Sequence, residues 1–150
     1  MSATTERKAQ LYVGCSLTTA PEEFKSAVER LKGVLREQGY GVFDFVGLVN
    51  GTPKDVYEYD IGHCVQNCDA FIAICDEPSL GLGWELGRAT DLGKPVLAVA
   101  HRDSKITRLV LGAAEVEPNL QFARYDDLAR DVPPLIGAML AANEVQQPRE

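Results

Sequence analysis

Short apolar runs alternate along this chain with longer segments in which apolar residues recur every three or four positions. Continuous apolar runs are typical of strands buried on both faces, whereas the longer periodicity is typical of amphipathic helices. The runs predict strands over residues 11–14, 40–46, 69–75, 95–100 and 120–123. The periodic segments predict helices over residues 21–38, 54–67, 84–92, 104–114 and 125–142.

The regular alternation of strand and helix predicts the fold class. Parallel strands joined by right-handed helical crossovers give an α/β fold with helices on both faces of the sheet. We therefore expect a single doubly wound, flavodoxin-like, three-layer domain over residues 1–150, with a five-stranded parallel sheet and loose ends at 1–8 and 143–150. In such a sheet the loops that follow the strands converge at one edge, where ligands bind.

Composition and charge narrow the range of functions. The chain is 45% hydrophobic and 25% charged, as is usual for a globular protein. Its formal net charge of −7 argues against nucleic-acid binding, which needs a basic face. No apolar run reaches transmembrane length, and residues 1–10 lack the apolar core of a secretion signal. We therefore expect a cytoplasmic protein that binds neither nucleic acid nor membrane.

The four cysteines fit a reducing compartment. Cys64 and Cys68 share a face of a predicted helix, close to His63 and Asp69. This spacing, with no second pair of ligands, is weak support for zinc. Buried free thiols are the simpler interpretation. We expect neither a metal ion nor another cofactor.

The segment 76–88 joins the third strand to the third helix and is rich in glycine. Backbone N–H groups and the helix dipole favour anions at such a turn. If the helix starts at Trp84, Glu85 lies in its first turn, where a carboxylate tends to stay ionised and can face the cleft. An ionised glutamate beside an adaptable loop suits covalent glycosyl transfer. In the alternative, Gly81 and Gly83 adopt unusual backbone angles and Glu85 only complements the dipole.

Other polar residues fall at the same edge of the predicted sheet. Tyr12, near the end of the first strand, can hydrogen-bond to Glu85 and fix its rotamer, and Asp60 can point a second carboxylate into the cleft. Ser16 and Ser79 offer hydroxyls to a sugar or phosphate. Each residue also has a structural alternative, as a core aromatic, a solvated helix residue or a helix cap.

Three motifs at these positions resemble the nucleoside 2-deoxyribosyltransferase superfamily, and above all its 2′-deoxynucleoside 5′-phosphate N-hydrolases. They are YVGCS at residues 12–16, YEYD at 57–60 and PSLGLGWELGRA at 78–89. A weaker similarity covers TRLVLGA at 107–113. The resemblance extends from residue 11 to about 114, and the third motif is its specific part.

The resemblance implies an enzyme that acts on nucleosides or nucleotides. By position, Glu85 matches the nucleophile that attacks the anomeric carbon, and Tyr12 matches the tyrosine that positions it. Asp60 matches the acid that handles the sugar and assists departure of the base. The other matching residues are implied to bind substrate or phosphate: Ser16, Ser79, Gly81, Gly83 and Thr107. Thr107 falls near a serine that family members contribute across a dimer interface, so a homodimer is also implied.

The chain departs from the hydrolases at two places. Thr18 stands where they carry an arginine, which weakens the expectation of a 5′-phosphate. The spacing from Asp60 to Asp69 is also one residue longer.

We expect an N-glycosidase that cleaves a (deoxy)nucleoside or its 5′-monophosphate through a glutamate glycosyl-enzyme intermediate. Base exchange by a deoxyribosyltransferase, a non-catalytic nucleotide-binding module and a flavoprotein of similar topology stay open as alternatives.

Overall fold

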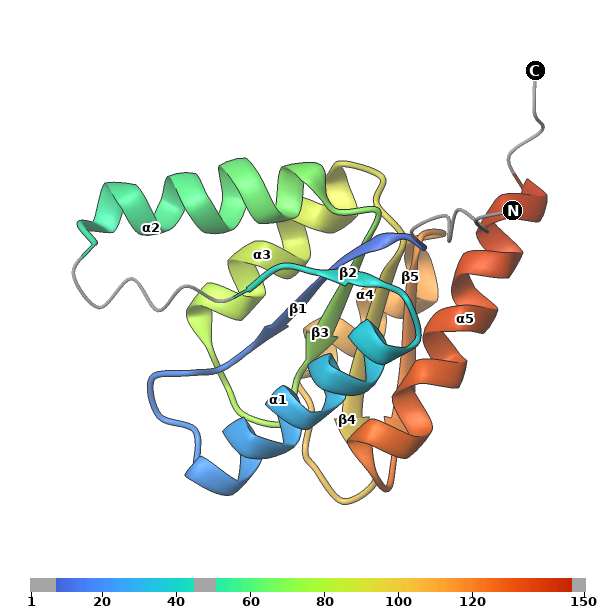
Figure 1. The fold of residues 1–150 in the computed structure, drawn as a ribbon, viewed down its shortest axis with the longest axis horizontal. Coiled ribbons are helices and arrows are strands. Elements are labelled where there is room, and N and C mark those ends of the chain that lie inside the picture. Colours follow the sequence, from blue (N-terminus) through green and yellow to red (C-terminus); the bar gives the residue numbers. More distant parts are fainter. Residues whose placement is uncertain (1–7, 45–50, 147–150) are drawn as a thin grey trace, which may run out of the picture.

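Five parallel strands form one sheet in the part of the chain that the structure describes. This computed structural model describes residues 8–44 and 51–146. The strands are β1 (Gln10–Cys15), β2 (Gly41–Val42), β3 (Ala70–Ile74), β4 (Val96–His101) and β5 (Leu120–Tyr125). They pair in the order β2-β1-β3-β4-β5. This order confirms the predicted doubly wound, flavodoxin-like α/β fold (Figure 1).

Helices cover both faces of the sheet (Figure 1). On one face α1 (Glu22–Glu37) packs beside α5 (Leu128–Gln146). On the other face lie η1 (Asp60–Val65), α3 (Leu80–Asp91) and α4 (Arg108–Val116). The short helix α2 (Pro53–Tyr59) has no buried residue and runs directly into η1. The three layers expected from the sequence are therefore present.

Successive residues of the central strands enter different cores, because side chains alternate between the two faces of a sheet. Leu11 and Val13 of β1 join the core under α1 and α5, whereas Tyr12 joins the core under η1 and α3. Every residue of β3 is buried. Burial on both faces explains the continuous apolar runs in the sequence. The same alternation directs Tyr12 toward α3.

The start of α3 differs from the sequence expectation. The helix begins at Leu80, inside the segment expected to form a turn, and Ser79 is its N-cap. The hydroxyl oxygen of Ser79 accepts a hydrogen bond of 3.1 Å from the N–H of Leu82. Gly81 and Gly83 are helical and neither has a positive φ, so the alternative in which they adopt unusual backbone angles is wrong. The serine cap satisfies an otherwise free N–H group and starts the helix despite two poor helix formers.

Most of the other differences between the predicted and the observed structure lie at the ends of helices and strands. α5 runs to Gln146, so the tail expected to be loose is helical in its first residues. β2 ends at Val42, short of the predicted strand end, and residues 45–50 lie outside the described part of the chain. Within residues 8–44 and 51–146, no helix has both the length and the apolar character needed to cross a membrane.

Candidate active site

The candidate site lies at the carboxyl ends of β1 and β3. These strands are neighbours in the sheet, but β1 connects onward to β2 on one side and β3 to β4 on the other. Such a change of direction opens a crevice where doubly wound sheets bind ligands. Tyr12 on β1, Asp60 at the start of η1 and Glu85 on α3 all line one cavity at this crevice. The structure thus brings together the three predicted catalytic residues.

Tyr12 and Glu85 are in direct contact. The hydroxyl of Tyr12 donates a hydrogen bond to Oε2 of Glu85, and the two residues are 5% and 8% exposed. Phe43 and Phe71 hold the Tyr12 ring, with ring centroids 6.3 and 5.4 Å away. Burial and the Glu85 carboxylate raise the pKa of Tyr12 far above its ordinary range, so the phenol keeps its proton and acts as a donor. Glu85 is therefore oriented by a side chain that packing holds in place.

Gly14 allows α3 to come this close to β1. A Cβ atom at Gly14 would lie 2.9 Å from the ring of Phe71 and 3.0 Å from Leu82 of α3. These distances are shorter than real Cβ atoms tolerate without a shift of their neighbours. Glycine at this position therefore permits the packing that brings Glu85 within reach of Tyr12.

Glu85 lies in the second turn of α3, not in the first turn as expected, because the helix begins at Leu80. The helix dipole acts mainly within the first turn, so it gives the Glu85 charge less support than expected. Burial raises the pKa of Glu85 to about 7; the Tyr12 hydrogen bond opposes this rise and the Asp60 charge adds to it. Near neutral pH the carboxyl group is therefore divided between its ionised and protonated forms.

Asp60 opens the π-helix η1. A π-helix makes i→i+5 hydrogen bonds, and such turns occur often at functional sites. A wider turn accommodates one additional residue. This fits the spacing between Asp60 and Asp69, which is one residue longer than in the hydrolases that the sequence resembles. Oδ1 of Asp60 is buried and has no hydrogen-bond partner among the described residues, and burial raises the pKa of this carboxyl. An unpartnered buried oxygen that lines a cavity is available to a ligand.

The first of two adjoining cavities, which we call the β1 cavity, has a volume of about 200 Å³. It extends from Asp60 and Glu85 past Tyr12 to Thr18 and Lys32. Its walls come from β1, the loop after β1, α1, α2, the start of η1 and α3. Acidic residues from one face of the sheet and a lysine from the helix on the opposite face therefore line this cavity.

The second cavity, the α2 cavity, has a volume of about 260 Å³ and lies between α2 and α3. The rings of Tyr57 and Trp84 meet there edge to face, with centroids 6.2 Å apart, and both residues are substantially exposed. Asp60 and Glu85 line this cavity as well as the β1 cavity. The two carboxylates therefore stand where the cavities meet.

Three of the predicted binding residues lie near the β1 cavity. Ser79 and Gly81 line it, and Ser79 also caps α3. Ser16 is only 2% exposed and does not line either cavity, although Cys15 and Leu17 on either side of it line the β1 cavity. Ser16 is thus placed within the loop and not at the cavity surface.

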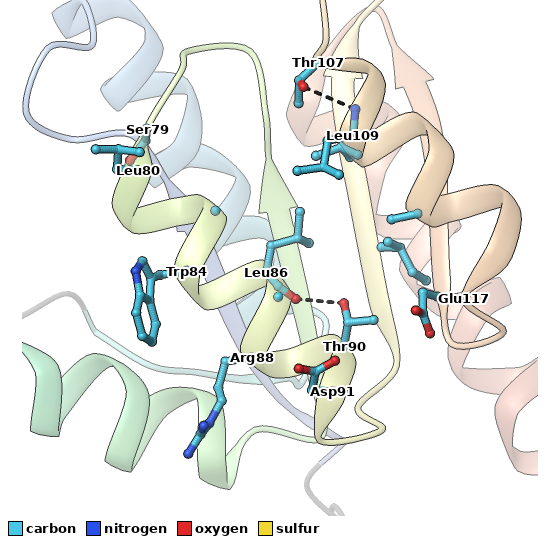
Figure 2. A pocket seen from close by; sticks show the side chains of 15 residues that line it. Ser79, Leu80, Trp84, Leu86, Arg88, Thr90, Asp91, Thr107, Leu109 and Glu117 are labelled. Atoms are coloured by element: carbon cyan, nitrogen blue, oxygen red, sulfur yellow. Dashed lines mark hydrogen bonds between the residues drawn. The ribbon is translucent and has the colours of Figure 1, made fainter.

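The other two predicted binding residues line a different surface, an apolar groove of about 770 Å³ between α3 and α4 (Figure 2). Gly83 and Thr107 line this groove and neither of the two cavities. Thr107 is the N-cap of α4, and its Oγ1 accepts a 3.2 Å hydrogen bond from the N–H of Leu109. Figure 2 shows Leu86 of α3 and Leu109 of α4 facing each other across the groove. Leu80 and Leu109 are 92% and 80% exposed, so the groove has an apolar rim.

The sequence analysis missed three residues that line the cavities. Tyr57 and Trp84 supply aromatic rings to the α2 cavity. Their closeness in sequence to Asp60 and Glu85 was a signal that could have found them. Lys32 is 5% exposed and lines the β1 cavity. No pattern in the sequence distinguishes it from the solvated lysines of an amphipathic helix.

The buried cysteines on η1 and just after it belong to the core. Cys64 and Cys68 are free thiols that pack with the apolar residues of η1 and α3. Burial raises the pKa of each to about 11, which keeps both protonated. In the described part of the chain, no three His, Cys, Asp or Glu side chains are grouped so that they could hold a metal ion.

Comparison with known proteins relates this arrangement to a family. A Thermofilum pendens protein that carries the name of a 2′-deoxynucleoside 5′-phosphate N-hydrolase is 31% identical over 110 residues, which are 67% of this chain and 75% of that protein. The 5-hydroxymethyl-dUMP N-hydrolase of Rattus norvegicus is 37% identical over 67 residues, 43% of this chain and 40% of the rat protein. The rat protein is therefore matched over less than half of its length.

A solved structure and a family model complete the comparison. The structure of a CMP N-glycosidase from Clostridium botulinum matches with a TM-score of 0.67 and 21% identity, covering 86% of this chain and 98% of that one. A likeness at this identity shows the fold. The family model for nucleoside 2-deoxyribosyltransferases matches residues 11–143, which include both cavities and all of the sheet except Gln10 at the start of β1. The chain therefore belongs to the nucleoside 2-deoxyribosyltransferase family of enzymes.

Proposed function

We propose that this protein cleaves the N-glycosidic bond of a (deoxy)nucleoside or its 5′-monophosphate, with Glu85 as the nucleophile. The observation that carries the proposal is the Tyr12–Glu85 hydrogen bond at the junction of two cavities, beside the unpartnered oxygen of Asp60. Membership of the family supports the reaction class, since relatives named as N-hydrolases break this bond.

The first chemical step forms a glycosyl ester. Breaking an N-glycosidic bond develops positive charge on the sugar ring, which a nearby carboxylate stabilises. Ionised Glu85 attacks C1′ through Oε1, while Tyr12 holds Oε2 by its hydrogen bond. The C1′–N bond breaks and its electron pair leaves with the base. Protonated Asp60 gives its proton to the departing base.

The second step releases the sugar. The Asp60 carboxylate takes a proton from water, and the water oxygen attacks C1′ as the bond to Glu85 breaks. Two displacements at C1′ retain its configuration. The net reaction adds one water molecule across the N-glycosidic bond. A second base in place of water would give base exchange, the transferase alternative.

The cavities suggest an orientation for the substrate. The base lies in the α2 cavity against Tyr57 and Trp84, because aromatic side chains stack on bases. C1′ lies at the junction beside Glu85 and Asp60. The 5′ end of the sugar then points into the β1 cavity, which Ser79 also lines.

A substrate panel tests the proposal. Ribonucleosides, deoxynucleosides and their 5′-monophosphates are incubated with the protein, with and without an added acceptor base, and the products are separated by chromatography. Free base without an acceptor identifies a hydrolase, and a new nucleoside formed only with an acceptor identifies a transferase. Thermal stabilisation by these ligands without any product identifies a binding module and contradicts the proposal.

We also propose that the protein forms a homodimer through the α3–α4 groove. Four exposed apolar side chains gather on α3 and α4: Leu80, Trp84, Leu109 and Val116. An apolar surface of this kind on a globular protein is typical of an interface, and a second copy can cover it with the same surface. Thr107, which the resemblance relates to a residue shared across a dimer, lines this groove.

The oligomeric state tests this part of the proposal. Light scattering of the parent chain should give the mass of a dimer, and Leu109→Glu should give a monomer, because it places a charge in the apolar contact. Leu92→Glu is the matched control, since Leu92 is 39% exposed but does not line the groove. A monomeric parent, or a dimer that Leu109→Glu leaves intact, contradicts the proposed interface.

The cytoplasm is the location we propose for this activity. All four cysteines are free thiols, two of them buried and two partly buried. Free thiols of this kind persist in a reducing compartment. Fractionation of cells that express the protein tests the proposal directly.

A further inference from the structure

Lys32 lines the β1 cavity from α1, and it is the one lysine or arginine among the described residues that line this cavity. The residue is only 5% exposed. Lysine is almost never buried to this degree unless its ammonium group is paired, because removal of a charge from water is costly. The position of Lys32 on a ligand cavity therefore needs a physical explanation.

The partner of Lys32 within the described chain satisfies the ammonium group only in part. Nζ donates to Oε1 of Glu29, three residues earlier on α1, at 3.2 Å. The side chain of Glu29 is 66% exposed, so water and salt screen its charge. An ammonium group has three N–H donors, and the bond to Glu29 uses one of them. A ligand in the cavity can accept from the others.

The charges on the β1 cavity come from opposite faces of the sheet. Lys32 belongs to α1, whereas Asp60 and Glu85 belong to η1 and α3. Cys15, at the end of β1, also lines the cavity and responds to both charges: burial raises the pKa of its thiol to about 11, the Lys32 charge opposes this rise and the Glu85 charge adds to it. The cavity therefore has a positive side on α1 and a negative side at the junction where the two cavities meet.

We propose that Lys32 makes the β1 cavity select a substrate that carries an anionic phosphate ester at its 5′ position. This inference rests on the proposed N-glycosidase function, which places C1′ at Glu85 and directs the 5′ end into the β1 cavity. Lys32 binds the phosphate through charge-assisted hydrogen bonds. Without this cation, ionised Glu85 would repel a phosphate from the cavity that it lines.

A comparison of two lysine variants tests the inference. Lys32→Met is compared with Lys25→Met, because Lys25 pairs with Glu22 three residues earlier on the same helix, at 3.5 Å, but does not line the cavity. We expect Lys32→Met to raise KM for a 5′-monophosphate about 10- to 100-fold, the effect of losing a hydrogen bond to a charged group. The matching unphosphorylated nucleoside should change less than about twofold, and Lys25→Met should behave as the parent does.

A binding measurement separates this inference from the proposed function. Calorimetric titration with the 5′-monophosphate, the nucleoside and inorganic phosphate requires no turnover. If no base is ever released but Lys32→Met alone weakens binding of the monophosphate and of inorganic phosphate, the N-glycosidase proposal fails and the anion role of Lys32 stands. Equal weakening of nucleoside and monophosphate, or unchanged monophosphate binding, overturns the inference.

The thermal stability of Lys32→Met is measured alongside its activity and ligand binding. Methionine replaces a buried charge by an apolar side chain of similar size, so the thermal midpoint should not fall. If Lys32→Met does not fold, Lys32→Gln takes its place with the same expected loss of monophosphate binding. If Lys32→Gln also leaves that binding unchanged, the inference is wrong.

Discussion

The phenol of Tyr12 donates a buried hydrogen bond to the carboxylate of Glu85, which lies 73 positions later in the chain. The bond favours the ionised carboxylate, whereas burial favours the neutral carboxyl group. Burial has the larger effect and brings the pKa of Glu85 to about 7. The pair therefore joins a strand to a helix and sets the protonation of the proposed nucleophile.

The Tyr12→Phe variant tests the role of this bond. It removes the donor and leaves the ring that packs against Phe71. We expect kcat to fall about 10- to 100-fold, because Glu85 loses its orienting partner. The pKa of Glu85 should also rise, which moves the acidic limb of the kcat/KM profile to higher pH. Tyr40→Phe, on a tyrosine that lines neither cavity, is the control; a shift of the same size in both variants contradicts the account.

The parent enzyme should show an acidic limb near pH 7. Glu85 must be ionised to attack C1′, so kcat/KM should rise as the pH rises through its pKa of about 7. Initial rates of base release across a series of buffers of constant ionic strength measure this limb. A profile that is already flat at about pH 5 is incompatible with a nucleophile of this pKa.

The stability of Glu85→Gln should depend on pH in a defined direction. The pKa of Glu85 rises from its ordinary value of 4.5 to about 7 on folding, so between these values the folded chain binds more protons than the unfolded chain. The free energy of unfolding of the parent therefore falls as the pH rises through this window. Glu85→Gln should be more stable than the parent above pH 7, by about 3 kcal/mol at most.

Below about pH 4.5 this advantage should vanish, because Glu85 is then protonated in both states of the parent. Urea unfolding at two pH values, one below and one above the window, measures the difference. An equal stability gap at both values would show that the Glu85 carboxyl group does not titrate as described.

Gly14→Ala should disturb the packing of α3 on β1. Its Cβ would meet the Phe71 ring at 2.9 Å and Leu82 at 3.0 Å, so we expect a loss of about 1–3 kcal/mol in unfolding free energy. Gly33→Ala is the control, because a Cβ at that position on α1 meets nothing within 4 Å. This control should gain about 0.5–1 kcal/mol. Similar effects in both variants would contradict a close-packing role for Gly14.

Much of the fold could be predicted from the sequence. Apolar runs that are buried on both faces, separated by amphipathic segments, leave few topologies other than a parallel sheet covered by helices. The same topology brings the ends of β1 and β3 to one edge, which places Tyr12 near Glu85. These expectations succeeded because they depend on patterns repeated over many residues.

The details that failed depend on single residues in three dimensions. A glycine-rich segment is typical of a turn, and only the Ser79 cap shows that α3 begins within it. Gly83 and Glu85 share one motif but are two residues apart in α3. Two steps along an α-helix turn the side-chain direction by about 200°, so these residues line different surfaces. The burial of Lys32 depends on how α1 packs against the rest of the chain, and the sequence pattern of α1 alone does not reveal this packing.

The rate of base release by Glu85→Gln shows whether Glu85 is the nucleophile. The measurement uses the best substrate of the panel, at saturating concentration, with circular dichroism and ligand titration to show that the variant folds and binds. We expect a loss of about 1000-fold or more, because glutamine keeps the shape and the Tyr12 contact but cannot form the glycosyl ester. A folded variant that binds substrate and releases base at the parent rate would contradict it.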